Sequence, residues 1–262
     1  LIIHLVNTLL VFVLILRLKP GVYVSSVVAF VFALHPMHVE SVTWISERKD
    51  VLYSLFYLGG LLAWLRYTDS PTAGRYLATM GLFVLSLFSK TIAVSFPLFL
   101  VAFDWYRGRK LFSKRVILEK VPFFALSLAI GLLGIYFTST ASDTSTPDIS
   151  WAYRPFIVSD AILIYLWKFI APFNLMNYYY YPDVSPGALP TRFYISAAIL
   201  VLLIVGVLTW VKRTKNKKRD LLLGILFFVI PTLFVLQLIP AGRAYAAERY
   251  TYLPYIGLAY IF

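Results

Sequence analysis

The sequence predicts an all-α, polytopic helical membrane protein, and three observations support this. Of the 262 residues, 60% are hydrophobic and only 14% are charged, whereas soluble domains average about 45–50% apolar and about 25% charged residues. Runs such as 192–211 and 221–240 are long enough to cross ~30 Å of hydrocarbon at about 1.5 Å per residue. The chain contains no cysteine, which excludes disulfides and thiolate metal sites.

The apolar pattern predicts about nine spans and one shorter helix. A run of 15 residues at 157–171 would extend only about 22 Å as a helix, so we expect it to lie along the outer membrane face or to dip in and return. The expected spans are 1–16, 22–35, 51–65, 76–89, 91–106, 117–138, 192–211, 221–240 and 251 onward.

Two short basic loops orient these spans. The loops 107–115 and 212–219 contain five and six cations and no acid, and such loops lie in the cytoplasm. Counting crossings from them places 36–50, the turn around Lys90, 172–191 and 241–250 on the outer face. The formal net charge of +12 is therefore attributed to cytoplasmic loops, and no nucleic-acid partner is expected. The chain starts without Met and ends inside an apolar run, so we expect a fragment.

The segment "LHPMHVESVTWISERKD" (34–50) gathers charge between two apolar runs. Glu40, Trp44 and Glu47 are spaced i, i+4, i+7, so they would share one face if 38–49 is helical. The two carboxylates could face a polar cavity as an acid, a base or a metal ligand. The alternative is a capped interfacial helix in which Glu47, Arg48, Lys49 and Asp50 pair locally.

His35, His38 and Glu40 resemble a metal-binding trio only in composition. The spacing differs from H-E-x-x-H, and Pro36 breaks the helix that would align the histidines. We expect His35 to make hydrogen bonds at a helix end.

Three further outer-face features each allow two interpretations. Lys90, in "LFSKTIAV", could meet a lipid phosphate or extend to the interface from a hairpin tip. Arg249 could bind phosphate in bidentate fashion, or Glu248 could pair locally with Arg249 or Arg243. The run "NYYYYP" (177–182) could stack on sugar rings, but an interfacial aromatic belt is favoured.

Four ordered segments resemble a known family. They are "FALHPMHVESVTWISERKDVLYSLFYLGGLLAWLRY" (32–67), "LSLFSKTIAVSFPLFLVAFDWY" (85–106), "YLWKFIAPFNLMNYYYYP" (165–182) and "AAERYTYLPYIGL" (246–258). Together they resemble the transmembrane and tetratricopeptide-repeat-containing O-mannosyltransferases and their bacterial relatives. The resemblance extends over nearly the whole chain, so we expect one transmembrane glycosyltransferase-like domain across 1–262.

The resemblance implies a C-type glycosyltransferase fold. It also implies a polyprenyl-phosphate sugar donor in the lipid bilayer, a protein hydroxyl as acceptor, and transfer on the outer or lumenal face. Some relatives use a divalent metal (Mg or Mn) and others do not. A multi-pass protein of a bacterial inner membrane is favoured, or of the endoplasmic reticulum if the source is eukaryotic.

In that fold class the principal catalytic acid follows the first helix. This chain would start at the second helix, so the principal acid is expected upstream of Leu1. The first helix with its outer loop and the C-terminal tetratricopeptide repeats are thus expected but absent.

The resemblance also suggests roles by matched position. Glu40 is expected to be a second acidic group of the site, and Lys90 and Arg249 are expected to hold the donor phosphate. Supporting roles are expected for His35, His38, Glu47, Arg48, Asp50 and Glu248. Two other functions stay open: a non-catalytic membrane anchor for a repeat domain, and a polyprenyl-linked lipid transporter.

Overall fold

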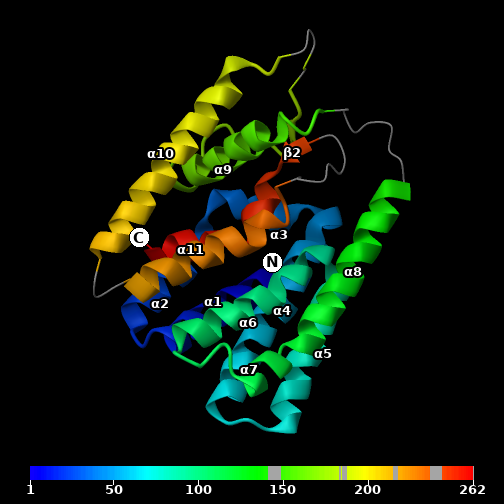
Figure 1. Ribbon diagram of the computed structural model, residues 1–262, viewed down its shortest axis with the longest axis vertical. Coiled ribbons are helices and arrows are strands. Elements are labelled where there is room, and N and C mark those ends of the chain that lie inside the picture. Colours follow the sequence, from blue (N-terminus) through cyan, green and yellow to red (C-terminus); the bar gives the residue numbers. More distant parts are fainter. Residues whose placement is uncertain (141–148, 183, 185–187, 215–217, 237–243, 262) are drawn as a thin grey trace.

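The computed structural model describes residues 1–140, 149–182, 184, 188–214, 218–236 and 244–261. In this described part, helices form a bundle and two short strands lie at one end (Figure 1). The helices are α1 (Ile2–Leu18), α2 (Val22–Leu34), α3 (Val39–Thr43), α4 (Arg48–Asp69), α5 (Ala73–Ser89), α6 (Phe96–Tyr106), α7 (Lys114–Leu118), α8 (Val121–Thr140), α9 (Arg154–Ile170), α10 (Thr191–Arg213), α11 (Lys218–Leu233) and α12 (Pro254–Ile261). Short 3-10 turns occur at Pro36–His38, Ile45–Glu47, Thr91–Ser95 and Glu248–Thr251.

The helical class is confirmed, but the expectation of about nine spans is not supported. Among the described residues, two helical stretches are long and apolar enough to cross a membrane. They are Lys114–Phe137, which joins α7 to most of α8, and Thr191–Arg213, which is α10. A third span results if α2 and the segment Pro36–Thr43, which are bent by 55°, are counted together. Other apolar helices, such as Ile2–Leu18, are shorter: 17 residues extend about 26 Å, less than the ~30 Å hydrocarbon core.

The loops nevertheless gather at the two ends of the bundle, in the two groups that the predicted orientation assigns to opposite faces. At one end, Asp69 is 2.5 Å from Arg107 and 3.7 Å from Arg17, and Lys19 lies 2.5 Å from Asp220. These contacts join four loops that were all expected in the cytoplasm. The loops expected on the outer face meet at the other end, around the residues described below.

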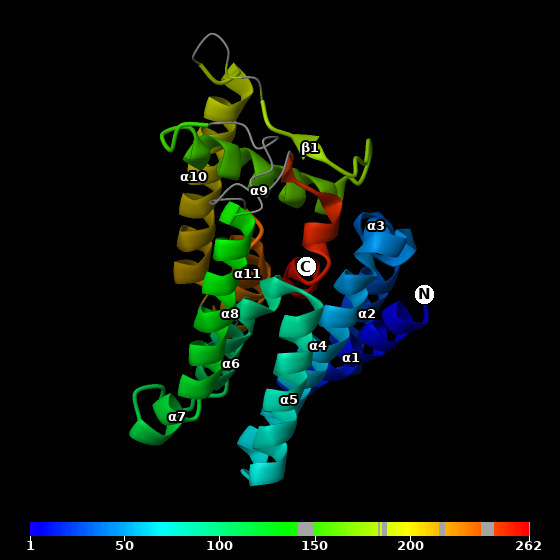
Figure 2. The same cartoon turned by 90° about the vertical axis from the view of Figure 1, so that its right-hand side faces the viewer.

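Helix α9 confirms the short helix expected at 157–171. It begins at Arg154 with Pro155 in its first turn, a favoured place for proline because its missing N–H would be unpaired there anyway. Both views show α9 running across the end of the bundle, beside the strands, while α8 and α10 run along it (Figures 1 and 2). That α9 lies on a membrane surface stays a prediction.

The only strands in the described part form an antiparallel pair that the sequence did not predict. Strand β1 (Tyr179–Tyr180) pairs with β2 (Ala244–Ala246), with Tyr179 opposite Ala246. This pairing ties the "NYYYYP" segment to the segment that leads into Arg249.

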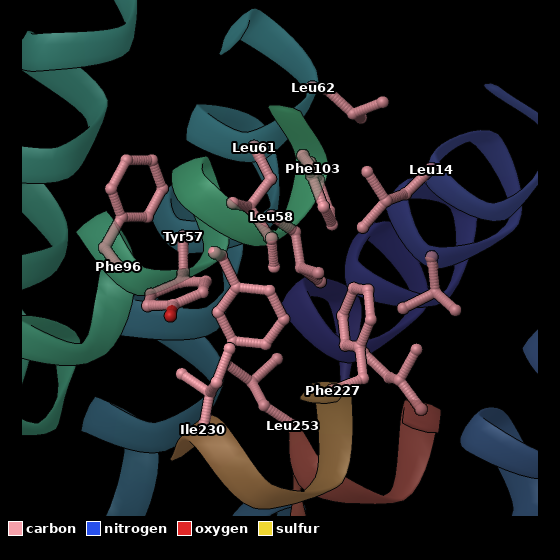
Figure 3. Close-up of a cluster of buried hydrophobic side chains, with 14 of the residues drawn as sticks. Leu14, Tyr57, Leu58, Leu61, Leu62, Phe96, Phe103, Phe227, Ile230 and Leu253 are labelled. Carbon is pink, nitrogen blue, oxygen red and sulfur yellow. The ribbon is translucent and has the colours of Figure 1, made fainter. Parts of the chain in front are cut away.

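Large apolar side chains from α1, α4, α6 and α11 and from Leu253, next to α12, fill the space between these elements (Figure 3). Their burial packs these helices against one another. The labelled members are Leu14, Tyr57, Leu58, Leu61, Leu62, Phe96, Phe103, Phe227, Ile230 and Leu253.

Two glycines let α11 and α12 approach closely. A Cβ added at Gly224 would lie 3.0 Å from the carbonyl oxygen of Gly257, and a Cβ added at Gly257 would lie 2.5 Å from the backbone nitrogen of Phe228. Backbone atoms cannot move aside as a flexible side chain can, so this contact requires glycine. Small residues at helix contacts serve the same purpose in other membrane proteins.

We expect Gly257→Ala to destabilise the protein by about 1–3 kcal/mol, because overpacking forces backbone shifts. Gly206→Ala in α10 is the matched control, since nothing lies within 4 Å of its added Cβ, and alanine there favours the helix by up to ~1 kcal/mol. Thermal unfolding midpoints in detergent measure both. Equal midpoints for the two variants would show that the close contact does not form.

Candidate functional site

The segment between α2 and α4 consists of turns, and its local chemistry explains why. Helix α2 ends at Leu34, and its C-cap residue His35 is extended because it precedes Pro36, which disfavours the helical conformation. His35 Nδ1 accepts a hydrogen bond from the Met37 backbone N–H at 3.2 Å, and its Nε2 lies 3.1 Å from the Phe169 carbonyl oxygen. The expected helix-end role of His35 is confirmed.

The continuous helix considered for 38–49 is wrong. Helix α3 ends at Thr43, whose hydroxyl donates to the Val39 carbonyl at 2.8 Å. Trp44 is extended, with φ −79° and ψ 120°, and a separate 3-10 turn covers Ile45–Glu47. Glu40 and Glu47 therefore do not share a helix face, but they converge on the same partner.

That partner is Arg249, which lies 209 residues beyond Glu40 in the sequence. Arg249 Nη1 donates to Glu40 Oε1 at 2.6 Å, and the Arg249 backbone N–H donates to Glu40 Oε2 at 2.9 Å. Glu47 Oε1 lies 3.6 Å from Arg249 Nε. The side chains of Glu40, Glu47 and Arg249 are all less than a tenth exposed. Removing one partner of such a buried ion pair strongly destabilises a protein, because it leaves the other charge buried and uncompensated.

Three aromatic rings surround the guanidinium group of Arg249. Its Cζ lies 4.7 Å from the ring centre of Tyr178, 5.1 Å from Tyr250 and 5.8 Å from Trp44. A planar guanidinium can bind carboxylates with its edges while its faces contact rings. Tyr178, one of the tyrosines of the "NYYYYP" segment, therefore lies against Arg249. That the segment stacks on sugar rings, or forms an interfacial aromatic belt, stays a prediction.

Lys90 forms the second ion pair of this end, with Asp50 Oδ1. Asp50 is fully buried, and its Oδ2 accepts a hydrogen bond from the Ser41 hydroxyl at 3.3 Å. Burial raises the pKa of the Asp50 carboxyl, and the Lys90 charge opposes that rise. Lys90 Nζ also lies 5.7 Å from the ring centre of Tyr250, so the two cations expected to bind phosphate flank one ring.

Glu248 does not pair with Arg249, contrary to one interpretation of the sequence. It accepts hydrogen bonds from the Met176 backbone N–H and from the Tyr179 hydroxyl, the latter at 3.5 Å. Burial raises the pKa of Glu248, and the Met176 bond opposes that rise. The alternative partner Arg243 lies outside the described residues.

Two other residues with expected supporting roles lie apart from the ion pairs. His38 is buried, with Nδ1 2.8 Å from the Phe32 carbonyl oxygen, and its ring contacts those of His4, His35 and Tyr252. Arg48 is exposed and donates from Nε to the Ile45 carbonyl at 3.0 Å.

That the principal acid lies upstream of Leu1 stays a prediction. Leu1 itself is an apolar, exposed residue that precedes α1. Its carbonyl oxygen accepts a hydrogen bond from the Leu5 backbone N–H at 3.0 Å. Leu1 is thus the N-cap residue of α1, and the carboxylates of the two ion-paired groups come from Glu40, Glu47 and Asp50.

In the part of the chain that the structure describes, no three His, Asp or Glu side chains are placed to hold a metal ion.

Sequence reasoning missed two polar anchors of the same end. Lys168 is buried and donates to the carbonyl groups of Phe173 and Asn174. Asp160 accepts from Arg192 Nη2 at 2.6 Å, from the Tyr245 hydroxyl at 2.7 Å and from the Ser196 hydroxyl at 2.8 Å. The sequence signal for each was a charged residue inside the apolar run 157–171.

Two cavities lie at the opposite end, on either side of α7. One of about 370 Å³ is lined by apolar residues including Val116 and Phe124. The other, of about 500 Å³, is lined by Tyr67, Arg115 and Glu119 among others. Glu119, the acid that lines the second cavity, is ion-paired with Arg109 and Arg115.

Comparison with known proteins agrees with the motifs. Protein O-mannosyl-transferase TMTC4 of Homo sapiens is 26% identical over 282 aligned residues, which cover 92% of this chain and 38% of that protein. Protein O-mannosyl-transferase TMTC1 of Mus musculus is 39% identical over 71 residues, which cover 26% of this chain and 8% of that protein. The chain thus spans less than two fifths of the length of these relatives. No family model and no solved structure matches it.

We expect Glu40→Gln to destabilise the protein by about 3–5 kcal/mol, because it leaves the buried Arg249 charge without its main partner. Arg48→Gln is the control on the same segment, and an exposed substitution of this kind changes stability by only about ±0.5 kcal/mol. Thermal unfolding in detergent separates the two. An unchanged midpoint for Glu40→Gln would contradict the ion pair.

The similarities support a relationship to the O-mannosyl-transferases with these names, and membrane association is supported by the apolar helices as well. The C-type fold and the bacterial origin stay predictions.

Proposed function

We propose that this chain is the membrane domain of a glycosyltransferase that moves a mannose-like sugar from a polyprenyl-phosphate donor to protein Ser or Thr hydroxyls. One observation carries the proposal. Residues from distant segments form two largely buried ion-paired groups at one end of an apolar bundle: Arg249 with Glu40 and Glu47, and Lys90 with Asp50. Ionisable groups placed there are costly and mark functional sites by default. The names of the similar proteins supply the reaction class.

Lys90 and Arg249 bind the donor phosphate in this proposal. The described hydrogen bonds of the Arg249 side chain use Nη1, so Nη2 can donate to a phosphate oxygen. Lys90 has three N–H donors, and its described hydrogen bond goes to Asp50. An added phosphate can thus bind beside the carboxylates without displacing them.

Glu40 is the acidic group that positions Arg249. Both of its carboxylate oxygens bind that one residue, so Glu40 sets the direction of the guanidinium group. A carboxylate base takes the proton of the acceptor hydroxyl. The hydroxyl oxygen attacks the anomeric carbon from the face opposite the phosphate and inverts it, while Lys90 and Arg249 stabilise the departing lipid phosphate. Removing one such donor group costs about 2.7–4 kcal/mol of transition-state stabilisation.

The partners follow from this chemistry: the lipid bilayer, a polyprenyl-phosphate sugar within it, and a protein acceptor. The reaction takes place on the outer face of a bacterial inner membrane, or on the lumenal face of the endoplasmic reticulum in a eukaryotic source. No step is assigned to a metal ion.

We expect Arg249→Ala in the full-length protein to slow sugar transfer by about 10²–10³-fold, as loss of one oxyanion-type donor does. Transfer of labelled mannose from polyprenyl-phosphate mannose to protein acceptors in membranes measures this. Lys110→Gln is the matched control, because Lys110 is an exposed cation at the opposite end.

Unchanged turnover in Arg249→Ala would show that Arg249 does not bind the phosphate. If the wild type transfers no mannose, a panel of other polyprenyl-phosphate sugars follows. Silence across that panel would favour the membrane anchor, and movement of a labelled polyprenyl phosphate across the bilayer without transfer would favour the transporter.

A further inference from the structure

The apolar cavity beside α7, with a volume of about 370 Å³, is built from four segments of the chain. It is formed by α6, by the loop 107–115, by α7 and by α8, whose lining side chains include Val101, Leu111, Val116 and Phe124. Lys120 also lines the cavity, but this lysine is buried and ion-paired with Asp104. Such a lining suits hydrocarbon, because a polar group that is buried without a partner is costly.

The cavity lies on a helix surface that suits contact with lipid. Its α8 side belongs to Lys114–Phe137, a stretch that is long and apolar enough to cross a membrane. The side chains of Phe124 and Leu128, which both line the cavity, are 39% and 64% exposed. In a membrane-spanning helix such exposed apolar side chains contact acyl chains, which therefore have direct access to the cavity.

The loop beside the cavity is positively charged. Lys114 and Arg115 directly precede the lining residue Val116, and both are exposed. Lys114 has no carboxylate partner in the described part of the chain, whereas Asp104 and Glu119 are buried and already ion-paired with other cations or with Arg115. The two nearby acids therefore leave the surface at the start of α7 positive, and this surface is complementary to an anion.

The turn before α7 adds an apolar side chain to this charged surface. The Ser113 backbone N–H donates to the Lys110 carbonyl at 3.0 Å, which closes a tight turn. Phe112 lies within that turn and is 93% exposed, while its neighbour Leu111 lines the cavity. Exposed aromatic side chains beside cations are typical of segments at the boundary between lipid headgroups and acyl chains.

We propose that this cavity and the turn before α7 bind an anionic phospholipid. One acyl chain occupies the apolar cavity, Phe112 inserts among neighbouring chains, and the phosphate contacts Lys114 and Arg115. An acidic protein would match the charge but would not fill an apolar cavity, so a phospholipid is the favoured occupant. The site lies at the opposite end of the bundle from Arg249, and it does not depend on the proposed sugar transfer.

The first test measures lipid binding to the full-length protein in detergent by native mass spectrometry. Phosphatidylglycerol and phosphatidylcholine with identical acyl chains are compared, so that only the headgroup differs, and the wild type should bind phosphatidylglycerol more tightly. Lys114→Gln should weaken that binding about fivefold and Lys114→Glu about 25-fold, because each unit of positive charge near anionic headgroups contributes about 1 kcal/mol. Binding of phosphatidylcholine should stay unchanged.

Arg66→Gln is the matched control, because Arg66 is an exposed cation at the same end that does not line the cavity. It should keep the wild-type affinity for phosphatidylglycerol. Equal weakening by Arg66→Gln and Lys114→Gln would show that binding follows the overall charge of this end, and it would overturn the proposal of a site. Equal affinity of the wild type for the two lipids would overturn it as well.

A second pair of variants tests the cavity itself. Ala125 lines the cavity, whereas Ala129, one turn further along α8, does not, and both are exposed. Ala125→Phe should lose the phosphatidylglycerol molecule that the wild type retains, because the ring fills the cavity, and Ala129→Phe should retain it. Retention by both variants would show that no acyl chain occupies the cavity, and the proposal would fail.

Discussion

The structure depends on one constraint: a charge at the boundary of an apolar bundle must have a partner. An unpaired ion in hydrocarbon costs several kcal/mol, and breaking a buried pair leaves that cost uncompensated. The chain meets the constraint with pairs between distant segments, such as Glu40 with Arg249 and Lys19 with Asp220. Each pair therefore joins loops as well as neutralising charge, and the loops at each end of the bundle are held together by their ions.

This constraint explains which features could be predicted from sequence. A long apolar run bounded by charge must form a helix in lipid, so helices occur at nearly all the expected ranges. The grouping of the loops at two ends could also be predicted, because basic loops mark one face; which end faces the cytoplasm stays a prediction. The number of spans could not be predicted, because an apolar run does not determine where its helix begins. The run 91–106 contains a 3-10 turn, Thr91–Ser95, before α6 begins at Phe96.

The candidate site likewise combines features that could be predicted from the sequence with features that could not. The spacing of Glu40 and Glu47 indicated that both face one place, and they do, but through a break at Trp44 and not along one helix. Partners could not be predicted: Lys90 has no acid near it in sequence, and its partner Asp50 lies 40 residues away. Pairing over such a distance is set by the packing of α4 against α5 and the turn after it. A single sequence contains no signal for that packing.

The chemistry of Arg249 joins the structural and functional arguments. Its planar guanidinium group can bind Glu40 through one edge and contact Tyr178 and Tyr250 through its faces, which the single ammonium group of lysine cannot do. With the plane fixed by aromatic rings and one edge fixed by Glu40, the remaining N–H groups have a defined direction. Fixed donors stabilise a developing charge without reorganising during the reaction. In the proposed function, the ion pair that stabilises the fold also orients the cation toward the donor phosphate.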